Sequence, residues 1–286
     1  MTKKKIRVSE IFLYGLIFLC SLVAVLFLVF IIVYVLSKGV KSVTPQFLTT
    51  VTSVRKGTVG IAGNIVNTLI IIMLTMLIAT PIGVGAAIYL NEYAKAGKFV
   101  SIIEFATEVL SGIPSIIFGL FGMMFFGETL GLGYSILTGS LTLILMVLPL
   151  ITRNTQEALK TVPVGYRNGA IGLGAGKWYM IRTILIPSAM PGIITGVILA
   201  IGRIVGESAA LLFTAGSAKL LPKGLLGVFD KIFQSGGTLT IQLYLSATSE
   251  GDFSSAFGIA VVLLIIVLAI NMATKALTKK FDVSRT

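Results

Sequence analysis

The chain has 286 residues, of which 56% are hydrophobic and only 12% are charged. Soluble domains carry about 25% charged residues, so half that fraction, combined with long apolar runs, indicates an integral membrane protein. The net charge of +12 is spread between apolar runs, which favours a role in membrane topology over nucleic-acid binding. With Cys20 as its single cysteine and no histidine, the chain is expected to form neither an intrachain disulfide nor a His/Cys metal site.

Apolar runs predict an all-α membrane protein with six transmembrane helices. In chain order these runs cover residues 11–36, 63–90, 114–126, 134–151, 187–212 and 254–273. The first run is too long for the apolar core of a signal peptide, so it is interpreted as a membrane anchor. Before the third run we expect an interfacial helix over 99–110, because Pro114 interrupts the apolar stretch there.

Six spans place both termini on one side of the membrane, and the distribution of basic residues tests this. The segments assigned to the cytoplasm carry 15 Lys and Arg residues, and those assigned to the outside carry 7. Cytoplasmic loops are enriched in Lys and Arg, so both termini are predicted to be cytoplasmic. The chain then divides into four parts: a cytoplasmic N-terminus (1–10), a first helix with an outer loop (11–57), a permease domain (58–277) and a cytoplasmic C-terminus (278–286).

Residues 153–187 form the longest polar insertion between two inner ends of spans. The insertion carries five Lys and Arg residues, with five glycines between positions 165 and 176. We expect short helices over 154–161 and 166–173, separated by Pro163 and glycine joints. Such a projection suits recognition by a partner in water, whereas the alternative is an ordinary basic loop on anionic lipid.

The glycine-rich part of this insertion does not match a nucleotide-binding loop. In the pattern G-x4-G-K-[ST], Gly176 and Lys177 would require a glycine at 171 and Ser or Thr at 178. The chain has Ile171 and Trp178 there. Any ATP and magnesium are therefore expected on another chain, and no cofactor is predicted for this one.

Charged residues near the inner ends of the spans are the first candidates for a substrate path. Glu104 and Glu108 are four residues apart and share a helical face. They indicate either an interfacial face in water or an inner mouth, to which Arg153 could add an attractive charge for an anion.

The second charged pair lies inside an apolar run. Arg203 and Glu207 fall at positions i and i+4 of the predicted fifth span, where charges are costly and usually pair or face a cavity. A guanidinium suits an oxyanion, and Ser208 and the small residues around it leave room for a solute. We predict that Arg203 binds an anion and that Glu207 orients it; the alternative is a structural pair locking two helices.

The insertion resembles the cytoplasmic signature EAA-x3-G-x9-I-x-L-P of the permease subunits of bacterial ABC importers. Ala170, Gly174, Ile184 and Pro187 match, and Ile186 replaces leucine. Asparagine and glycine replace the first two signature residues. The resemblance implies a type-1 importer permease fold and coupling helices, within about 153–182, that dock on the ATPase. It assigns this coupling role to Arg167, Asn168, Gly169, Ala170 and Gly174.

Three further segments narrow the resemblance to the permease subunits of phosphate importers, of the A type. They are SGIPSIIFGLFGMMFF at 111–126, GRIVGESAALLFTAG at 202–216 and TLTIQLYLSATSEG at 238–251. The resemblance implies inward phosphate transport by alternating access in a bacterial cytoplasmic membrane. It also implies a homologous C-type permease, two cytoplasmic ATPases, and an extracytoplasmic phosphate-binding protein docking on 37–60 and 213–253.

Other functions remain open from the residues alone. Within the same class, the substrate could be another oxyanion such as molybdate or sulfate. A channel or secondary transporter would need no ATPase, which leaves the polar insertion without a purpose. A regulatory role in phosphate sensing is compatible with all of these observations.

Overall fold

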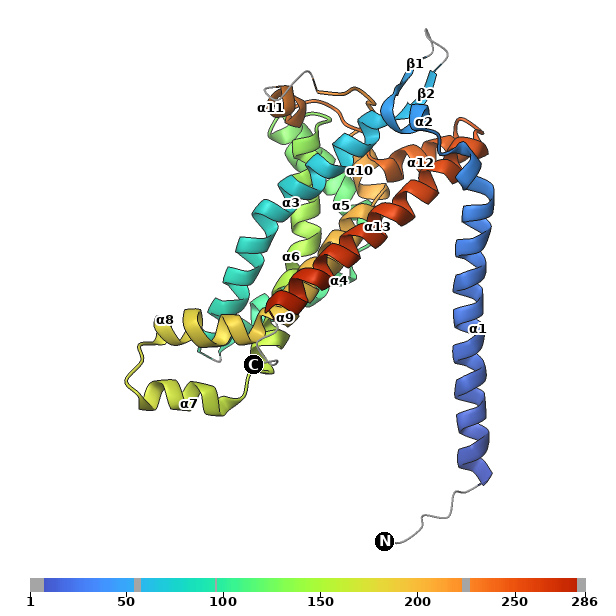
Figure 1. The fold of residues 1–286 in the computed structure, drawn as a ribbon. Coiled ribbons are helices and arrows are strands. Elements are labelled where there is room, and N and C mark those ends of the chain that lie inside the picture. Colours follow the sequence, from blue (N-terminus) through green and yellow to red (C-terminus); the bar gives the residue numbers. More distant parts are fainter. Residues whose placement is uncertain (1–7, 54–57, 96, 223–226, 282–286) are drawn as a thin grey trace.

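A computed structural model describes residues 8–53, 58–95, 97–222 and 227–281. These residues form a bundle of long helices with one small antiparallel hairpin (Figure 1). The outer part of the chain begins with α1 (Val8–Gly39), η1 (Val40–Ser42), α2 (Pro45–Thr49), β1 (Val51–Ser53) and β2 (Thr58–Ile61). The remaining elements are α3 (Ala62–Ile88), η3 (Tyr89–Tyr93), α4 (Lys98–Gly112), α5 (Ser115–Gly122), η4 (Met123–Thr129), α6 (Ile136–Lys160), α7 (Val164–Gly172), α8 (Lys177–Met180), η5 (Ile181–Leu185), α9 (Ile186–Gly206), α10 (Ala209–Thr214), α11 (Gly227–Ile232), α12 (Leu239–Thr248) and α13 (Phe253–Phe281).

The helices divide into crossings much as the sequence predicts. Five helices in the described ranges are long and apolar enough to cross a membrane, and a sixth crossing results if α4 and the α5–η4 pair count as one broken span. The start of α1 and the end of α13 lie toward the end that carries α7 and α8, called here the inner end (Figure 1). Of the cytoplasmic termini predicted at 1–10 and 278–286, residues 1–7 and 282–286 lie outside the described residues.

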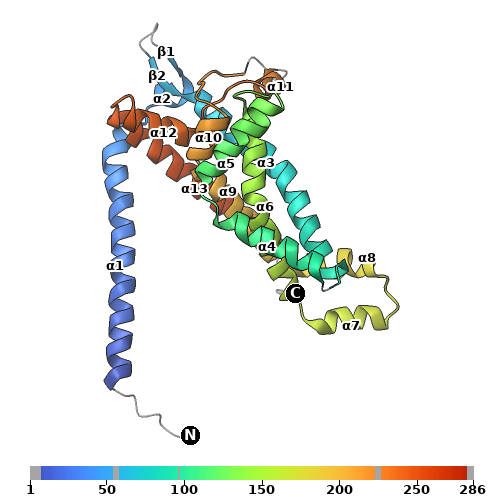
Figure 2. The same ribbon diagram turned by 180° about the vertical axis from the view of Figure 1, so that it is seen from behind.

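The third span is broken where the sequence predicts. The α4 and α5–η4 segments meet at an angle of 103°, with Ile113 and Pro114 in extended conformations between them. Proline disfavours the helical conformation of the residue before it, which explains the break. Seen from behind, α4 lies obliquely across the inner half of the bundle (Figure 2).

The centre of the bundle is α6. In its most apolar window 67% of the residues are buried, against 28% for α3, α9 and α13 and none for α1. Leu143, Val147 and Ile151 on α6 have no exposed surface and pack in the main core with residues of α3 and α9. The helix α6 therefore lies at the centre of the bundle, packed against α3, α5 and α9.

One predicted boundary is wrong, and one predicted helix is not separate. The helix α6 continues to Lys160, so Arg153 and the helix expected over 154–161 belong to α6 rather than to a separate element of the insertion. The predicted fifth span ends too late, because α9 stops at Gly206 and Glu207 is extended (φ −82°, ψ 122°). A hydropathy pattern reports which residues prefer lipid, but a helix can leave the membrane without ending.

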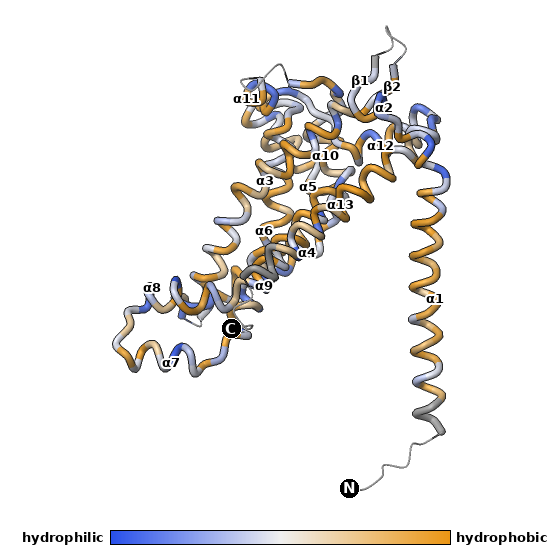
Figure 3. The backbone as a smooth tube through the Cα atoms, in the orientation of Figure 1, coloured by the Kyte–Doolittle hydropathy of each residue, from blue (hydrophilic) through white to orange (hydrophobic). Residues whose placement is uncertain are grey.

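The outer end contains more structure than the polar segments there predict. Residues 37–60, expected to be a loop, hold α2 and the strands β1 and β2, which pair in antiparallel fashion. The segment 213–253 contains α12, whose Leu239 and Ile241 are almost completely buried. Hydrophilic residues gather at both ends of the molecule, while hydrophobic residues follow the long helices (Figure 3).

The first helix stands apart from the bundle along most of its length (Figures 1 and 2). Its contact with α13 includes the ring of Tyr34, which lies 5.8 Å from that of Phe257 in an edge-on arrangement. Gly39 also approaches α13 closely, since a Cβ at this position would lie 2.3 Å from the Phe257 carbonyl oxygen. The rest of α1 presents apolar side chains outward, as a lipid-facing helix does.

Candidate coupling and translocation sites

The polar insertion forms a compact unit at the inner end. Here α7 and α8 form two arms of a projection that extends away from the bundle (Figure 1). Ala170, Met180, Ile181 and Leu185 are buried in a small core of their own, separate from the main core, together with Leu159 at the end of α6. The projection therefore has a packed interior of its own residues and the end of α6.

The residues that match the signature hold this projection together. Gly174 has a positive φ of 79°, and its N–H donates to the carbonyl oxygen of Ile171 at 2.9 Å. The N–H of Ala175 donates to the carbonyl oxygen of Ala170 at 3.0 Å. These two bonds make a Schellman motif, which ends α7 and favours glycine at the left-handed position.

The two departures from the signature lie on the exposed side of α7. Asn168 and Gly169 are exposed, and a Cβ at Gly169 would meet no atom within 4 Å. Ala170, by contrast, is 5% exposed and packs in the inner core. The matching residues thus build the element, and the substituted ones lie where a partner would contact it.

Arg167 is placed differently from the other predicted coupling residues. Its Nη1 lies 2.5 Å from Oε1 and 2.7 Å from Oε2 of Glu92, in η3, and its Nη2 donates to the carbonyl oxygen of Leu159 at 3.0 Å. The side chain of Glu92 is 4% exposed and that of Arg167 is 21% exposed. The guanidinium therefore faces into this chain, which sequence reasoning did not predict because its partner lies 75 residues away.

The predicted Arg203–Glu207 pair does not form. Because α9 ends at Gly206, Glu207 is not on the same helical face; its Oε1 instead accepts a hydrogen bond from the N–H of Ala210 at 3.0 Å. Its backbone carbonyl oxygen accepts from Oγ1 of Thr240 at 2.8 Å. Glu207 is 9% exposed and stabilises the start of α10, where a carboxylate is favoured by the helix dipole.

Arg203 is left with its charge available. Its side chain is exposed, and the described part of the chain holds no ion pair with its guanidinium. It lies one turn before the end of α9, and Ser208 follows as the half-buried residue before α10. The structure thus separates the two predicted pathway charges into an exposed cation and a structural carboxylate.

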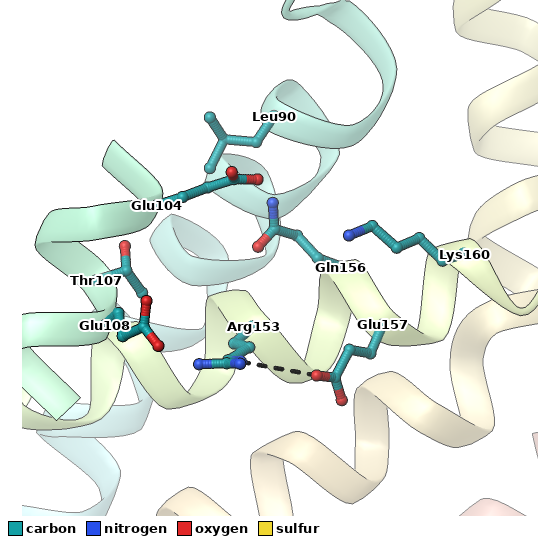
Figure 4. A pocket seen from close by; sticks show the side chains of 8 residues that line it. All are labelled: Leu90, Glu104, Thr107, Glu108, Arg153, Gln156, Glu157 and Lys160. Carbon is teal, nitrogen blue, oxygen red and sulfur yellow. Dashed lines mark ion pairs between the residues drawn. The ribbon is translucent and has the colours of Figure 1, made fainter. Parts of the chain in front are cut away.

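The inner-end charges border a cavity of about 260 Å³ between α4 and α6. Figure 4 shows Glu104 and Glu108 on one side and Arg153 on the other, with Arg153 Nε 3.7 Å from Glu157 Oε1. The side chains of Arg153 and Glu157 are 59% and 66% exposed, so this ion pair is weak. The lining carries three carboxylates against two cations, Arg153 and Lys160, so it is not a dedicated site for an anion.

A polar network at the outer end was missed by the sequence analysis. Glu250 lies 3.1 Å from Nζ of Lys219 and accepts hydrogen bonds from Gln242 at 3.1 Å and Ser246 at 2.8 Å. Burial raises the pKa of Glu250, but the bonds from Ser246 and Lys219 outweigh burial and bring the pKa below its ordinary value. The four residues fasten α12 to the loop before it.

A second missed feature is Lys231 of α11, which is 2% exposed. Its Nζ donates to the carbonyl oxygen of Ser235 at 2.8 Å, and burial lowers the pKa of its amine. Isolated lysines in polar segments give no sequence signal for burial, because Lys is exposed in most proteins.

Comparison with known proteins identifies the family. Residues 79–284 match the model of the binding-protein-dependent transport system inner membrane component. The probable ABC transporter permease protein YqgI of Bacillus subtilis is 37% identical, with 91% of this chain and 92% of that protein aligned. The phosphate transport system permease protein PstA of Xylella fastidiosa (strain Temecula1) is 32% identical over 88% and 86%, and PstA of Mycobacterium leprae is 34% identical over 74% and 68%.

Solved structures share the fold. The chain of a bacterial alginate ABC transporter superposes with a TM-score of 0.71 at 13% identity, covering 96% of each chain. A chain of the MetNI methionine ABC transporter in an inward-facing conformation superposes with a TM-score of 0.59 at 21% identity, covering 78% of this chain and 94% of that one. The predicted importer permease architecture is confirmed.

Proposed function

Because this chain belongs to the family of binding-protein-dependent transport system inner membrane components, we propose that it is the A-type permease subunit of an ATP-driven importer of inorganic phosphate. Phosphate is assigned as the substrate because the chain aligns with phosphate permeases named PstA at 32–34% identity over most of its length. The membrane is the bacterial cytoplasmic membrane, and both termini are cytoplasmic, as the basic residues predict.

The projection built by α7 and α8 supplies the coupling surface. Its large apolar side chains include Ile171, Leu173 and Trp178, which are 61%, 91% and 60% exposed. An exposed apolar patch on a polar projection favours a protein partner, and Asn168 and Gly169 lie on the same element. The partner proposed for this surface is the ATPase, which binds ATP and magnesium.

The full assembly then contains four kinds of chain. A homologous PstC-type permease pairs with this subunit, two PstB-type ATPases lie on the cytoplasmic side, and a PstS-type phosphate-binding protein docks outside. The outer hairpin and the α11–α12 region, within residues 37–60 and 213–253, offer the docking surface for the last of these.

Arg203 is the residue proposed to contact phosphate. An exposed guanidinium near the outer end of a spanning helix can hold a phosphate through two hydrogen bonds. Since Glu207 caps α10, no carboxylate of this chain is paired with Arg203 in the described ranges, and the phosphate would supply the missing negative charge. Alternating access would expose this arginine first to the outside and then to the cytoplasm.

The test is uptake of labelled phosphate by proteoliposomes that contain the two permeases, the ATPase and the binding protein. The expected result is uptake that requires ATP and is blocked by unlabelled phosphate but not by sulfate or molybdate. ATP-dependent uptake of sulfate or molybdate instead would support the assignment as an ATP-driven importer but would refute phosphate as the substrate. Uptake by this chain alone, without ATPase, would overturn the coupling role.

A further inference from the structure

Two contacts connect the inner projection to the end of α3, and both reach the short π-helical segment η3. The first is the bidentate pair between Arg167 of α7 and Glu92. The second places Nζ of Lys177, at the start of α8, 4.8 Å from the centre of the Tyr93 ring. The segment η3 ends the α3 span, since Ala94 after it is extended, and it contacts both α7 and α8.

Glu92 is held in one position by its neighbours. Its carboxylate is 4% exposed, and besides Arg167 it accepts a hydrogen bond from Nδ2 of Asn91 at 2.6 Å. A buried carboxylate with fixed donors has a defined orientation and a strong pairwise interaction with its cation. A displacement of the guanidinium is therefore transmitted to η3 rather than absorbed by a mobile side chain.

Arg167 of α7 contacts two other elements at once. While Nη1 binds Glu92, Nη2 donates to the carbonyl oxygen of Leu159, in the last turn of α6. The carbonyl oxygen of Leu159 also accepts from the N–H of Val162 at 3.4 Å, so the guanidinium adds a second, shorter hydrogen bond at the end of α6. A planar group with several donors can do this, but the single ammonium of lysine cannot reproduce it.

The rest of the projection packs in the inner core, to which the end of α6 and the start of α9 also contribute. Val84 and Ile88 bring α3 to the edge of that core, and Val84 also packs against the main core. The polar contacts on η3 add directional links between α3 and the projection, whose apolar contact is confined to this edge. Rigid connections of this kind carry coupling when an element has two arrangements.

We propose that the Arg167–Glu92 pair is the strut that transmits movement of α7 to α3 during the transport cycle. Arg167 and Glu92 are positioning residues in this role: neither contacts phosphate or ATP. The inference rests on the proposed function in one respect, that an ATPase moves α7. The link between α7 and α3 is a property of this chain alone.

The test uses the complete four-component complex with Arg167→Lys, which retains the charge and loses the two-armed contact. Uptake per ATP hydrolysed is expected to fall about tenfold, the size of a typical coupling between two sites, while the complex still assembles and hydrolyses ATP. Glu92→Gln is expected to give the same phenotype. Lys98→Arg is the control, because Lys98 is an exposed basic residue at the start of α4, outside the coupling segment, and its exchange should leave the ratio unchanged.

Hydrogen exchange separates this proposal from the choice of substrate. In the wild-type complex, a non-hydrolysable ATP analogue should change exchange in both α7 and the segment 84–93. In Arg167→Lys only the change in α7 should remain. This readout needs no substrate. If the complex does not transport phosphate but still shows linked changes in α7 and 84–93, the assignment of phosphate is refuted and the role of the Arg167–Glu92 pair is supported.

Two outcomes would overturn the proposal. One is a normal uptake-to-ATP ratio with linked exchange in Arg167→Lys. The other is restoration of normal uptake per ATP by the double variant Glu92→Gln/Arg167→Gln, which removes both charges and leaves two amides. That second result would assign the pair a purely structural role, because neutral amides can fill the site without the bidentate link.

Discussion

The separation of Arg203 from Glu207 leads to a prediction that stability measurements can decide. The variants are Arg203→Ala, Glu207→Ala and the double variant. If the two residues formed an ion pair inside the membrane, removal of the arginine would leave a buried unpaired carboxylate at a cost of about 3–5 kcal/mol. In the structure the carboxylate instead accepts from Ala210 N at 3.0 Å, and the arginine is exposed.

The magnitudes follow from these contacts. Arg203→Ala removes an exposed side chain and should change the free energy of unfolding by no more than about 0.5 kcal/mol. Glu207→Ala removes a charge-assisted hydrogen bond and leaves the Ala210 N–H without its acceptor, which should cost about 1.5–3 kcal/mol. Because the two side chains share no partner, the two effects should add to within about 0.5 kcal/mol.

The assay is unfolding of the purified subunit in mixed micelles by a graded denaturing detergent, followed by tryptophan fluorescence from Trp178. Uptake in the reconstituted complex is measured in parallel. We expect Arg203→Ala to remain folded and to lose uptake, and Glu207→Ala to lose stability. A coupling energy above about 1 kcal/mol in the double-mutant cycle, or normal uptake by Arg203→Ala, would refute the reasoning.

Three further predictions concern stability. Gly63→Ala should prevent normal folding, because its Cβ would lie 1.8 Å from the carbonyl oxygen of Lys219; expression and thermal stability are compared with Gly15→Ala, where no atom lies within 4 Å. Leu143→Ala, at a position with no exposed surface, should cost about 2–5 kcal/mol in the same detergent titration. Glu250→Gln should lower thermal stability slightly at neutral pH, because the pKa of Glu250 is depressed in the folded state. That difference should start to decline as pH falls below the ordinary Glu value of about 4.3 and should vanish only once pH lies below the depressed pKa of the folded state; a constant difference down to acid pH would contradict the assigned ionisation.

The sequence predicts best where one physical cause dominates. Apolar length predicts the spans, and Pro114 predicts the break between α4 and α5 because proline restricts the preceding residue. Gly174 is predicted as a helix stop, and it has the expected positive φ. In each case the cause lies within a few residues of its effect.

Prediction fails where the cause is distant in the chain. The i, i+4 spacing of Arg203 and Glu207 indicates a shared face only if the helix continues, and its end at Gly206 is accompanied by bonds from Ala210 and from Thr240, 33 residues away. Likewise Arg167, directly before the signature, is predicted to act in coupling to the ATPase, but its partner Glu92 comes from the end of another span. The sequence shows that the insertion contains large apolar residues. It does not show which of them are exposed, because that depends on which neighbours are buried in the inner core.

The isolated position of α1 has a consequence for the order of synthesis. This helix is made first, yet the ring that packs on Tyr34 belongs to Phe257, more than two hundred residues later. At a synthesis rate of about 5–20 residues per second, the interval lasts about 10–40 s. During that time α13 is not yet available to pack against α1. The surface of α1 is apolar and uninterrupted by charge from Phe12 to Ser37, so the helix is stable in lipid before α13 is made.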